Sequence, residues 1–426
     1  MVSRRHSPRV HRDRPHQAGI HGHPHETGLA ALCGLADQYQ RHAADDPAQG
    51  DGPGPGPVLR PCRPLPRQFR IPQPHPLYPA YRHGQGPGKA QLPGAHRLHR
   101  RACCVSSVDV SIVIATYNRP VQLAETLKSC LGQSNRLGQT LEIVVVDNHP
   151  SRNGMPVVEQ MDVSSPFAIR YVADPVRNMS ALRNRGFAEA KGRWVAIIDD
   201  DEIADHDWLD ELIGAAEATE ADIVVGPRLA SFAGGRPPAY DPDGADFIRD
   251  LGLKDQAVVD LTWPDGKPRY GLGTGNSAFN MARCFPAGEP PMRLEFGDAG
   301  GEDAELFIRL HRSGRRIVWA SRAFVTETVA GHRTKVAYRL VRARREAQHY
   351  VAIYLDVTPK PSRVRAILIA KGLAQVVAGF LLALVTLEFG SETRLKGRLM
   401  MAQGLGKLTW TRPVGYISEP TASAAS

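Results

Sequence analysis

Between residues 108 and 328 the chain repeats one pattern, in which a short apolar, β-branched run leads into a polar cluster and then into apolar residues at helical spacing. Such runs are typical of strands that are covered on both faces, because neither face has to be polar. Strands that alternate with helices predict an α/β fold with a mostly parallel sheet. Ligands of such sheets bind beyond the carboxyl ends of the strands, so the polar cluster after each run is a candidate for function.

The repeats also place the elements of this fold. Residues 231–269 are rich in Gly, Pro and Asp and predict a long functional loop. Helices are expected at residues 121–131, 180–191, 207–218 and 302–313, and Gly192 has the position of a helix C-cap. Strands are expected at residues 110–115, 141–146, 168–172, 194–198, 222–225, 275–281, 316–319 and 323–328.

Residues 1–106 differ in composition from the rest of the chain. They hold 16 of the 34 prolines, 11 of the 16 histidines, and fifteen Lys and Arg against six Asp and Glu. This surplus equals the net charge of +9 of the whole chain, so residues 107–426 are neutral and the high pI does not indicate nucleic-acid binding. We expect a disordered tail, because few apolar side chains are available to offset the entropy of ordering. A start site assigned too far upstream is a second hypothesis.

The most informative polar cluster is Asp199-Asp200-Asp201, which directly follows the apolar run at 194–198. Three adjacent carboxylates repel one another, and a hard divalent cation would relieve that repulsion and keep positions open for phosphate oxygens. The alternative is an acidic loop that caps the next helix. A second acidic pair, Glu302-Asp303, follows Gly300-Gly301. It fits a general base on a glycine hinge, but also ordinary first-turn residues favoured by the helix dipole.

Beyond Gly331 the chain becomes helical and basic, and then apolar. Residues 366–387 are mostly apolar, yet their uninterrupted core at 376–387 is shorter than the roughly 20 residues that span a bilayer. Basic residues lie on both sides of this segment. The pattern favours a helix or hairpin in the cytoplasmic membrane interface, with a buried core helix and a single membrane span as the alternatives. The six cysteines form no CxxC pair, which favours a reduced, cytosolic environment.

Taken in order, the motifs TYNRP, VVVDN, RN-x-G, IIDDDE and GGED resemble those of glycosyltransferase family 2, whose members have the GT-A fold. The resemblance covers about residues 108–335. Within the family, the segments VVGPRLA, TGNSAF and GGEDAELF look most like bacterial succinoglycan-type exopolysaccharide glucosyltransferases. The Q-x-x-R-W signature of processive synthases is absent from the sequence, and Arg342-x-x-Arg345 stands in the comparable region. This difference favours the addition of a single sugar.

The resemblance implies roles for individual residues. Thr116 and Asp147 would line the nucleobase pocket, and Arg183 would lie near the nucleotide. Asp199 and Asp201 would form a D-x-D pair that holds manganese or magnesium against the diphosphate, with Asp199 also contacting the nucleotide. Asp147 is followed by Asn148, where many relatives have a second Asp, so the sequence departs from the family pattern at this point.

Asp303 would be the base that deprotonates the acceptor hydroxyl of an inverting transfer. The implied donor is a UDP-sugar, with UDP-glucose expected, and the implied acceptor is a polyprenyl-diphosphate-linked oligosaccharide in exopolysaccharide or cell-surface glycan synthesis. The implied organisation is a tail at 1–106, a GT-A domain at 107–335 and a helical region at 336–426 that associates with the cytoplasmic face of the bacterial inner membrane.

Two other functions are weighed against this one. A sugar nucleotidyltransferase is expected to have a glycine-rich and basic phosphate loop after the first strand, and TYNRP is not such a loop. A catalytically degenerate GT-A-like binding or scaffold protein would have lost a key carboxylate, whereas Asp199, Asp201 and Asp303 are all present. A dinucleotide oxidoreductase is disfavoured because no GxGxxG follows the first strand.

Overall fold

The structure is a computed structural model that describes residues 108–415, except 264–266, 270, 287–288 and 386–390. The described residues all belong to one compact unit. The tail expected at 1–106 lies outside the described residues.

The strands are β1 (Val110–Thr116), β2 (Leu141–Asp147), β3 (Ile169–Ala173), β4 (Trp194–Asp199), β5 (Glu202–Ala204), β6 (Ile223–Val225), β7 (Arg228–Phe232), β8 (Ser277–Asn280), β9 (Ile317–Trp319) and β10 (Val325–Val329). The α-helices are α1 (Pro120–Leu131), α2 (Met155–Asp162), α3 (Met179–Glu189), α4 (Trp208–Thr219), α5 (Met281–Cys284), α6 (Glu302–Arg312), α7 (Val336–Val357), α8 (Pro361–Val385) and α9 (Ser391–Leu408).

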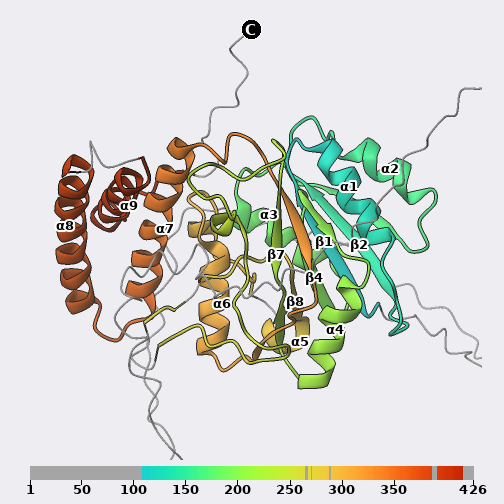
Figure 1. The fold of residues 1–426 in the computed structure, drawn as a ribbon. Helices are drawn as coiled ribbons and strands as arrows, with labels where there is room; N and C mark the ends of the chain where they lie inside the picture. Colours follow the sequence, from blue (N-terminus) through green and yellow to red (C-terminus); the bar gives the residue numbers. More distant parts are fainter. Residues whose placement is uncertain (1–107, 264–266, 270, 287–288, 386–390, 416–426) are drawn as a thin grey trace, which may run out of the picture. The chain divides into compact units, whose positions relative to one another are not determined.

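The main sheet has seven strands in the order β3-β2-β1-β4-β8-β6-β9 (Figure 1). The strands β3, β2, β1 and β4 run parallel to one another, and β6 is parallel to β9, whereas β8 is antiparallel to both β4 and β6. The predicted α/β fold with a mostly parallel sheet, of the GT-A type, is therefore confirmed. The parallel register brings the carboxyl ends of β1, β2 and β4 to one edge, where the polar clusters of the sequence meet.

Both faces of this sheet are covered, as the continuous apolar runs predict. Alternate residues of a strand point to opposite faces. In β1, Ile112 and Ile114 pack in one core with Leu123 of α1, and Val113 packs in the other core with Leu182 of α3. The same two cores take in α4 on the first face and α6 on the second. The helix α3 that carries Arg183 and the helix α6 that carries Asp303 therefore lie on the same face.

A second, three-stranded sheet in the order β5-β10-β7 was not predicted. Only β10 had an expected strand at its position, and β7 extends into the segment that was expected to be loop. Its strand β5 starts at Glu202, directly after the aspartate triplet, and pairs antiparallel with β10. In addition, the backbone N–H of Thr328 donates to the carbonyl of Asp201 at 2.8 Å. The second sheet thereby fixes the backbone on the far side of the triplet.

The interpretation of Gly192 as a helix C-cap is wrong. Helix α3 ends earlier, at Glu189, and Ala190 at its C-cap has an extended backbone. Gly192 instead lies against β1, because a Cβ atom at this position would be 2.5 Å from the amide nitrogen of Ser111. The glycine is needed for close approach of two backbones and not for helix termination.

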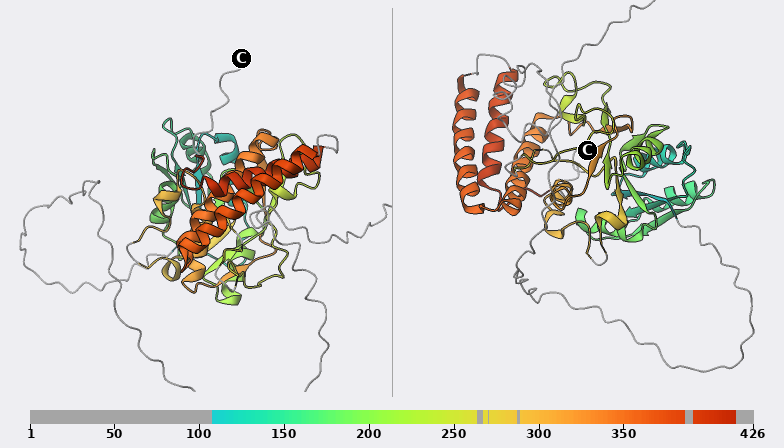
Figure 2. Two further views of the ribbon diagram at one scale, coloured as in Figure 1. Left: turned by 90° about the vertical axis from the view of Figure 1, so that its left-hand side faces the viewer. Right: turned by 90° about the horizontal axis from the view of Figure 1, so that it is seen from below.

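The C-terminal part is a layer of three long helices (Figures 1 and 2). Helices α8 and α9 cross closely through glycines, since a Cβ atom at Gly379 would lie 2.6 Å from the carbonyl oxygen of Gly397. Helix α8 has 25 residues, and its most apolar window of 18 residues has a mean hydropathy of 2.1 and is only 17% buried. By length and composition it is able to cross a membrane. Its exposure disagrees with the alternative of a buried core helix.

Candidate active site

The three aspartates after β4 point to different surroundings. Asp200 is buried and accepts hydrogen bonds from Thr116 Oγ1 and from Arg119 Nη1, both at 2.8 Å. Asp201 accepts from the same Arg119 nitrogen at 2.7 Å. Asp199 is the most open of the three, with 31% of its side chain exposed, and its Oδ1 lies 3.3 Å from Arg183 Nη2. The middle aspartate therefore has a structural role, and the outer two form the D-x-D pair of the sequence.

Arg183 connects this pair to the second acidic cluster. It is almost completely buried, and its Nη1 donates to Glu302 Oε1 at 2.8 Å and to Asp303 Oδ1 at 2.6 Å. Asp303 Oδ1 also accepts from Thr274 Oγ1 at 2.9 Å. Burial, together with the charge of Asp303, raises the pKa of Glu302 to about 7, although Arg183 opposes this rise. Carboxylates about 100 residues apart in sequence thus share one guanidinium.

The donor set of Asp199 and Asp201 fits a hard divalent cation. Each carboxylate gives one oxygen to an arginine, and among the residues that the structure describes nothing donates a hydrogen bond to the other oxygen. Burial and the neighbouring carboxylates raise the pKa of Asp201 to about 7 against the opposing charge of Arg119. No group of three or more His, Cys, Asp or Glu within the described ranges is arranged to hold a metal. Two carboxylates with phosphate oxygens are a usual arrangement for Mg²⁺.

Thr116 and Asp147 are register partners at the ends of β1 and β2. Asp147 is buried, and its two oxygens accept from the amide of His149, the amide of Gly154 and the hydroxyl of Tyr171 at 2.8–3.0 Å. It therefore holds the loop after β2. Thr116 is engaged with Asp200, as described above. Neither residue contacts the cluster around Arg183, and both lie at the same edge of the sheet.

Two further residues at this edge were not predicted from the sequence to belong to the site. Asn148 is 3% exposed, and its Oδ1 has no hydrogen-bond partner within the described part of the chain. A buried acceptor without a partner is a candidate for a hydrogen bond from a water or from a ligand N–H. The sequence marked Asn148 only as a departure from the family.

The second residue, Arg249, comes from the long loop. Its buried guanidinium donates to the carbonyls of Gly226, Gly273, Gly275 and Asn276. Burial, aided by the charge of Arg228, lowers the pKa of Arg249 to about 10. The hydrogen bonds of Arg249 to these carbonyls hold the strand-like segment that carries Thr274. A single arginine in a polar loop gives no sequence signal for such a role.

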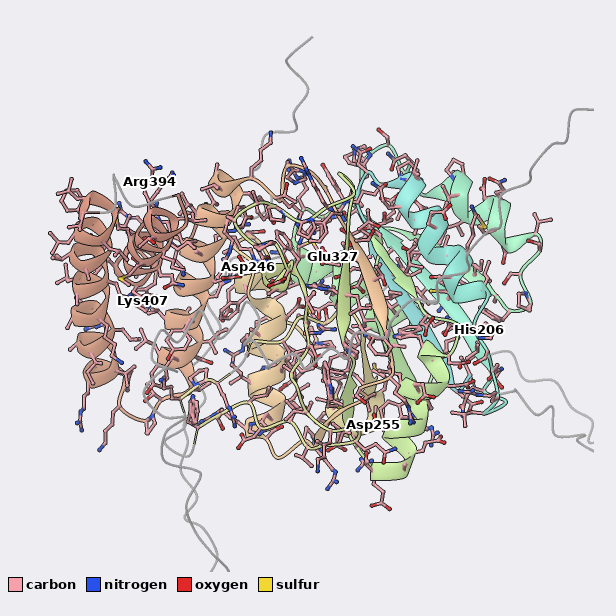
Figure 3. The ribbon with its side chains drawn as sticks, in the orientation of Figure 1. His206, Asp246, Asp255, Glu327, Arg394 and Lys407 are labelled. Carbon is pink, nitrogen blue, oxygen red and sulfur yellow. The ribbon has the colours of Figure 1, made fainter. Side chains whose placement is uncertain are left out.

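Behind the triplet, an ion-pair network joins the two sheets. Glu327 of β10 (Figure 3) is buried and pairs with Arg228 and Arg333, and Arg333 also lies 3.8 Å from Asp201. Burial alone would raise the pKa of Glu327, but the two arginines outweigh it and lower that pKa to about 2. Glu327 therefore remains charged and holds Arg333 beside Asp201.

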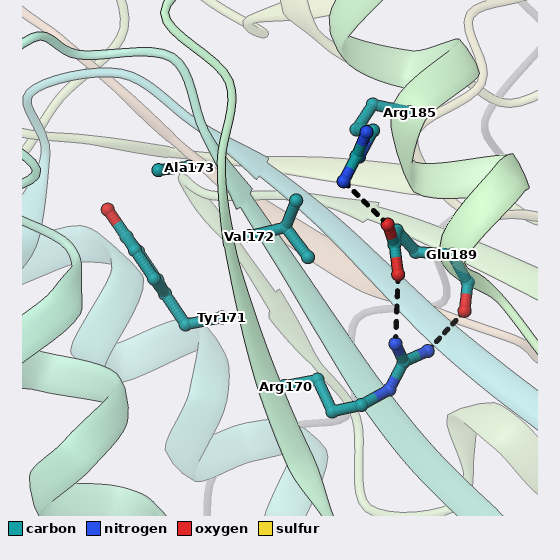
Figure 4. Close-up of a pocket in the computed structure, with 6 residues that line it drawn as sticks. All are labelled: Arg170, Tyr171, Val172, Ala173, Arg185 and Glu189. Carbon is teal, nitrogen blue, oxygen red and sulfur yellow. Dashed lines mark hydrogen bonds and ion pairs between the residues drawn. The ribbon is translucent and has the colours of Figure 1, made fainter. Parts of the chain in front are cut away.

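A separate depression at the outer edge of β3 has no part in this site (Figure 4). Its lining is Arg170, Tyr171, Val172, Ala173, Arg185 and Glu189. Both arginines pair with Glu189, and Arg170 also pairs with Glu142. The positive charges in the depression are thus already neutralised.

Residues 111–260 match the family model described as glycosyl transferase family 2. The chain is 31% identical over 242 residues to the succinoglycan biosynthesis protein ExoM of Rhizobium meliloti, covering 57% of this chain and 74% of ExoM. It is 33% identical over 117 residues to ExoO of the same organism, covering 28% of this chain and 32% of ExoO. Among solved structures it is similar to the mannosyltransferase PcManGT of Pyrobaculum calidifontis, with 18% identity, a TM-score of 0.43, and coverage of 71% of this chain and 87% of that one. On the strength of the ExoM relationship and the family match, this chain belongs to glycosyl transferase family 2.

Proposed function

We propose that this family 2 glycosyltransferase is an inverting, metal-dependent enzyme that transfers glucose from UDP-glucose to a lipid-linked oligosaccharide. The observation that carries the proposal is the arginine-centred cluster. Arg183 bridges Asp199 at the end of β4 and Asp303 at the start of α6, so a metal-binding carboxylate and a base lie around one guanidinium. The carboxylates that a degenerate scaffold would lose are all present.

In the proposed reaction Asp199 and Asp201 would hold a divalent cation, which would neutralise the charge that develops on the departing diphosphate. Asp303 accepts the proton of the acceptor hydroxyl as that oxygen attacks the anomeric carbon. Because the attack comes from the side opposite the diphosphate in a single displacement, the configuration is inverted. Arg183 and Thr274 both donate to Oδ1 of Asp303, and in the described part of the chain no group donates to Oδ2. Oδ2 is therefore the oxygen available for the proton.

The nucleotide is proposed to lie at the edge formed by Thr116, Asp147 and Asn148. The unpartnered Oδ1 of Asn148 suits an N–H donor, such as the imide N–H of uracil. Guanine offers N–H donors as well, so this contact alone supports either base. The preference for UDP rests on the likeness to succinoglycan-type glucosyltransferases, and it is the part that the experiment tests first.

The C-terminal helices support the proposed acceptor and location. A lipid-linked oligosaccharide presents its reactive end at a membrane surface, and the exposed apolar face of α8 offers a means of reaching that surface. ExoM and ExoO are named as succinoglycan biosynthesis proteins, which supports a role in exopolysaccharide synthesis. We accordingly propose that the enzyme works at the cytoplasmic face of the inner membrane.

The test is calorimetric titration of UDP and of GDP into the full chain, with and without manganese, and into Asp201→Ala. We expect tight binding of UDP that requires manganese and is lost in Asp201→Ala. A preference for GDP would keep the enzyme class and overturn the donor. Absence of binding to either nucleotide by a folded protein would favour the degenerate scaffold.

A further inference from the structure

The turn that precedes α6 has an unusual backbone. Gly300 and Gly301 have φ angles of +86° and +91°, which side-chain-bearing residues rarely adopt. Helix α6 starts at the next residue, Glu302. The conformation of these two glycines therefore sets the direction in which the first turn of α6 presents Glu302 and Asp303.

The imidazole of His349, on α7, lies directly against this turn. A Cβ atom at Gly301 would be 2.7 Å from Cγ of His349, and a Cβ atom at Gly300 would be 3.1 Å from its Cε1. Nε2 of His349 lies 2.8 Å from the carbonyl oxygen of Ala299. Because a carbonyl oxygen only accepts, Nε2 carries the hydrogen and donates it.

The same imidazole is neutral near pH 7. Burial lowers the pKa of His349 to about 4, and the nearby positive charge of Arg345 acts in the same direction, while the bond to Ala299 opposes the shift. A neutral imidazole with its hydrogen on Nε2 is a fixed donor. The contact is thus defined both in shape and in hydrogen-bond direction.

The helix that carries His349 is held in place from its other side. The side-chain amide of Gln348 donates to the carbonyl of Thr409 at 3.0 Å and accepts from the amide of Val414 at 3.1 Å, so it fastens α7 to the chain after α9. A Cβ atom at Gly406 of α9 would lie 2.3 Å from the carbonyl oxygen of Arg344, which shows how closely the two helices approach. His349 is therefore presented by a rigid support.

We propose that His349 is a positioning residue for the reaction, which holds the turn at residues 299–301 so that the carboxylate of Asp303 faces the acceptor hydroxyl. This inference rests on the proposed role of Asp303 as the base. Arg183 and Thr274 hold the side chain of Asp303, and His349 holds the backbone of the turn before it. A misplacement of about 1 Å in a reacting group can cost on the order of 100-fold in rate.

The test compares three substitutions in the full chain. His349→Ala removes both volume and donor, His349→Phe fills the volume without a donor, and His349→Gln restores an N–H at about the reach of Nε2. His206→Ala is the matched control, because the side chain of His206 is 72% exposed at the start of α4 (Figure 3). The measurements are the release of UDP from UDP-glucose, UDP affinity with manganese, and amide hydrogen exchange of residues 296–305.

We expect His349→Ala to lower kcat about 100-fold with UDP affinity within about twofold of the wild type, and to speed exchange at residues 296–305 but not in β2. His349→Gln should recover most of kcat and of the protection, and His349→Phe should recover less. Equal rates for the Phe and Gln variants, a parallel loss of UDP affinity and kcat, or unchanged exchange in His349→Ala would each overturn the proposal.

Hydrogen exchange and the Asp303→Asn variant distinguish a failure of this inference from a failure of the proposed function. Hydrogen exchange needs no turnover, so it decides the positioning of the turn even with a different donor sugar. If His349→Ala does not fold, the comparison of the Phe and Gln variants decides in its place. Activity that persists in Asp303→Asn would remove Asp303 as the base, and with it the catalytic part of the inference, while UDP and manganese binding would still support the enzyme class.

Discussion

At the scale of single residues, Asp303 shares Arg183 with two other carboxylates, and this sharing determines what its replacement does. Asp303→Asn keeps an Oδ1 acceptor for Arg183 and Thr274 but cannot take a proton. We expect kcat to fall by about 10²- to 10⁴-fold, with UDP and manganese affinity retained. Release of UDP and calorimetry measure the two effects, and Asp243→Asn, in an exposed part of the long loop, is the control. An Asp303→Asn enzyme with wild-type kcat would disprove the assignment.

Arg249 gives a residue-scale prediction about stability. Arg249 is 7% exposed, and its guanidinium donates to carbonyls on two separate stretches of backbone, at Gly226 and at residues 273–276. Arg249→Met keeps the stem but removes the donor to the carbonyls of Gly226, Gly273 and Gly275, whereas the carbonyl of Asn276 still accepts from the amide of Gly226. We expect the free energy of unfolding to fall by about 3 kcal/mol or more, as measured by urea denaturation. Arg236→Met, at an exposed position, should change it by less than about 0.5 kcal/mol; a similarly small effect at Arg249 would contradict its structural role.

At the scale of elements, the glycines of α8 and α9 predict opposite effects for one chemical change. Gly379→Ala places a methyl group 2.6 Å from the carbonyl of Gly397, so it should destabilise the protein by about 1–3 kcal/mol. Gly214→Ala, in α4, meets no atom within 4 Å and should stabilise it by about 0.5–1 kcal/mol. Thermal unfolding of the two variants checks both signs. A stabilising Gly379→Ala would mean that the two helices are not packed through this glycine.

The strands of the two sheets differ in how far the sequence could predict them. The strands of the main sheet were predictable because burial on both faces produces uninterrupted apolar runs such as that of β4. The second sheet was not, because β5 has three residues and no residue of β7 is fully buried, and both depend on β10, which lies about 100 residues away. Long-range pairing of short strands leaves no local periodicity.

The candidate site, too, could be predicted from the sequence only in part. Asp199, Asp201 and Asp303 could be chosen because their motifs stand at strand ends and helix starts. The contacts that organise them could not be predicted, because Arg249 and His349 resemble ordinary surface residues until distant elements bury them. Asp147 was correctly placed at the sheet edge, but both of its oxygens accept hydrogen bonds from the loop after β2. The acceptor at this edge that has no partner in the described part of the chain is Oδ1 of Asn148.

At the scale of the whole molecule, the C-terminal helices present an apolar face beside a catalytic domain of mixed charge. Large apolar side chains of α8 are roughly half exposed, with Phe380 at 53% and Leu384 at 51%. An exposed apolar surface of this extent is costly in water and marks an interaction site. The sequence places Arg363 and Arg365 within the first turns of α8, and Arg394 (Figure 3) near the start of α9. Basic residues around an apolar face suit an anionic lipid surface.

This arrangement predicts binding of the full chain to vesicles that contain anionic phosphatidylglycerol, as measured by co-sedimentation. Phe380→Glu combined with Leu384→Glu should weaken that binding at least about tenfold, since each buried apolar side chain contributes about 1.5–3 kcal/mol. Raising the salt concentration should weaken it further, because the attraction of the basic residues is screened. Val121→Glu combined with Val163→Glu, which alters two exposed valines on α1 and after α2, should leave it unchanged. If both double variants bind like the wild type, the face of α8 does not meet lipid, and the enzyme must reach its acceptor by other means.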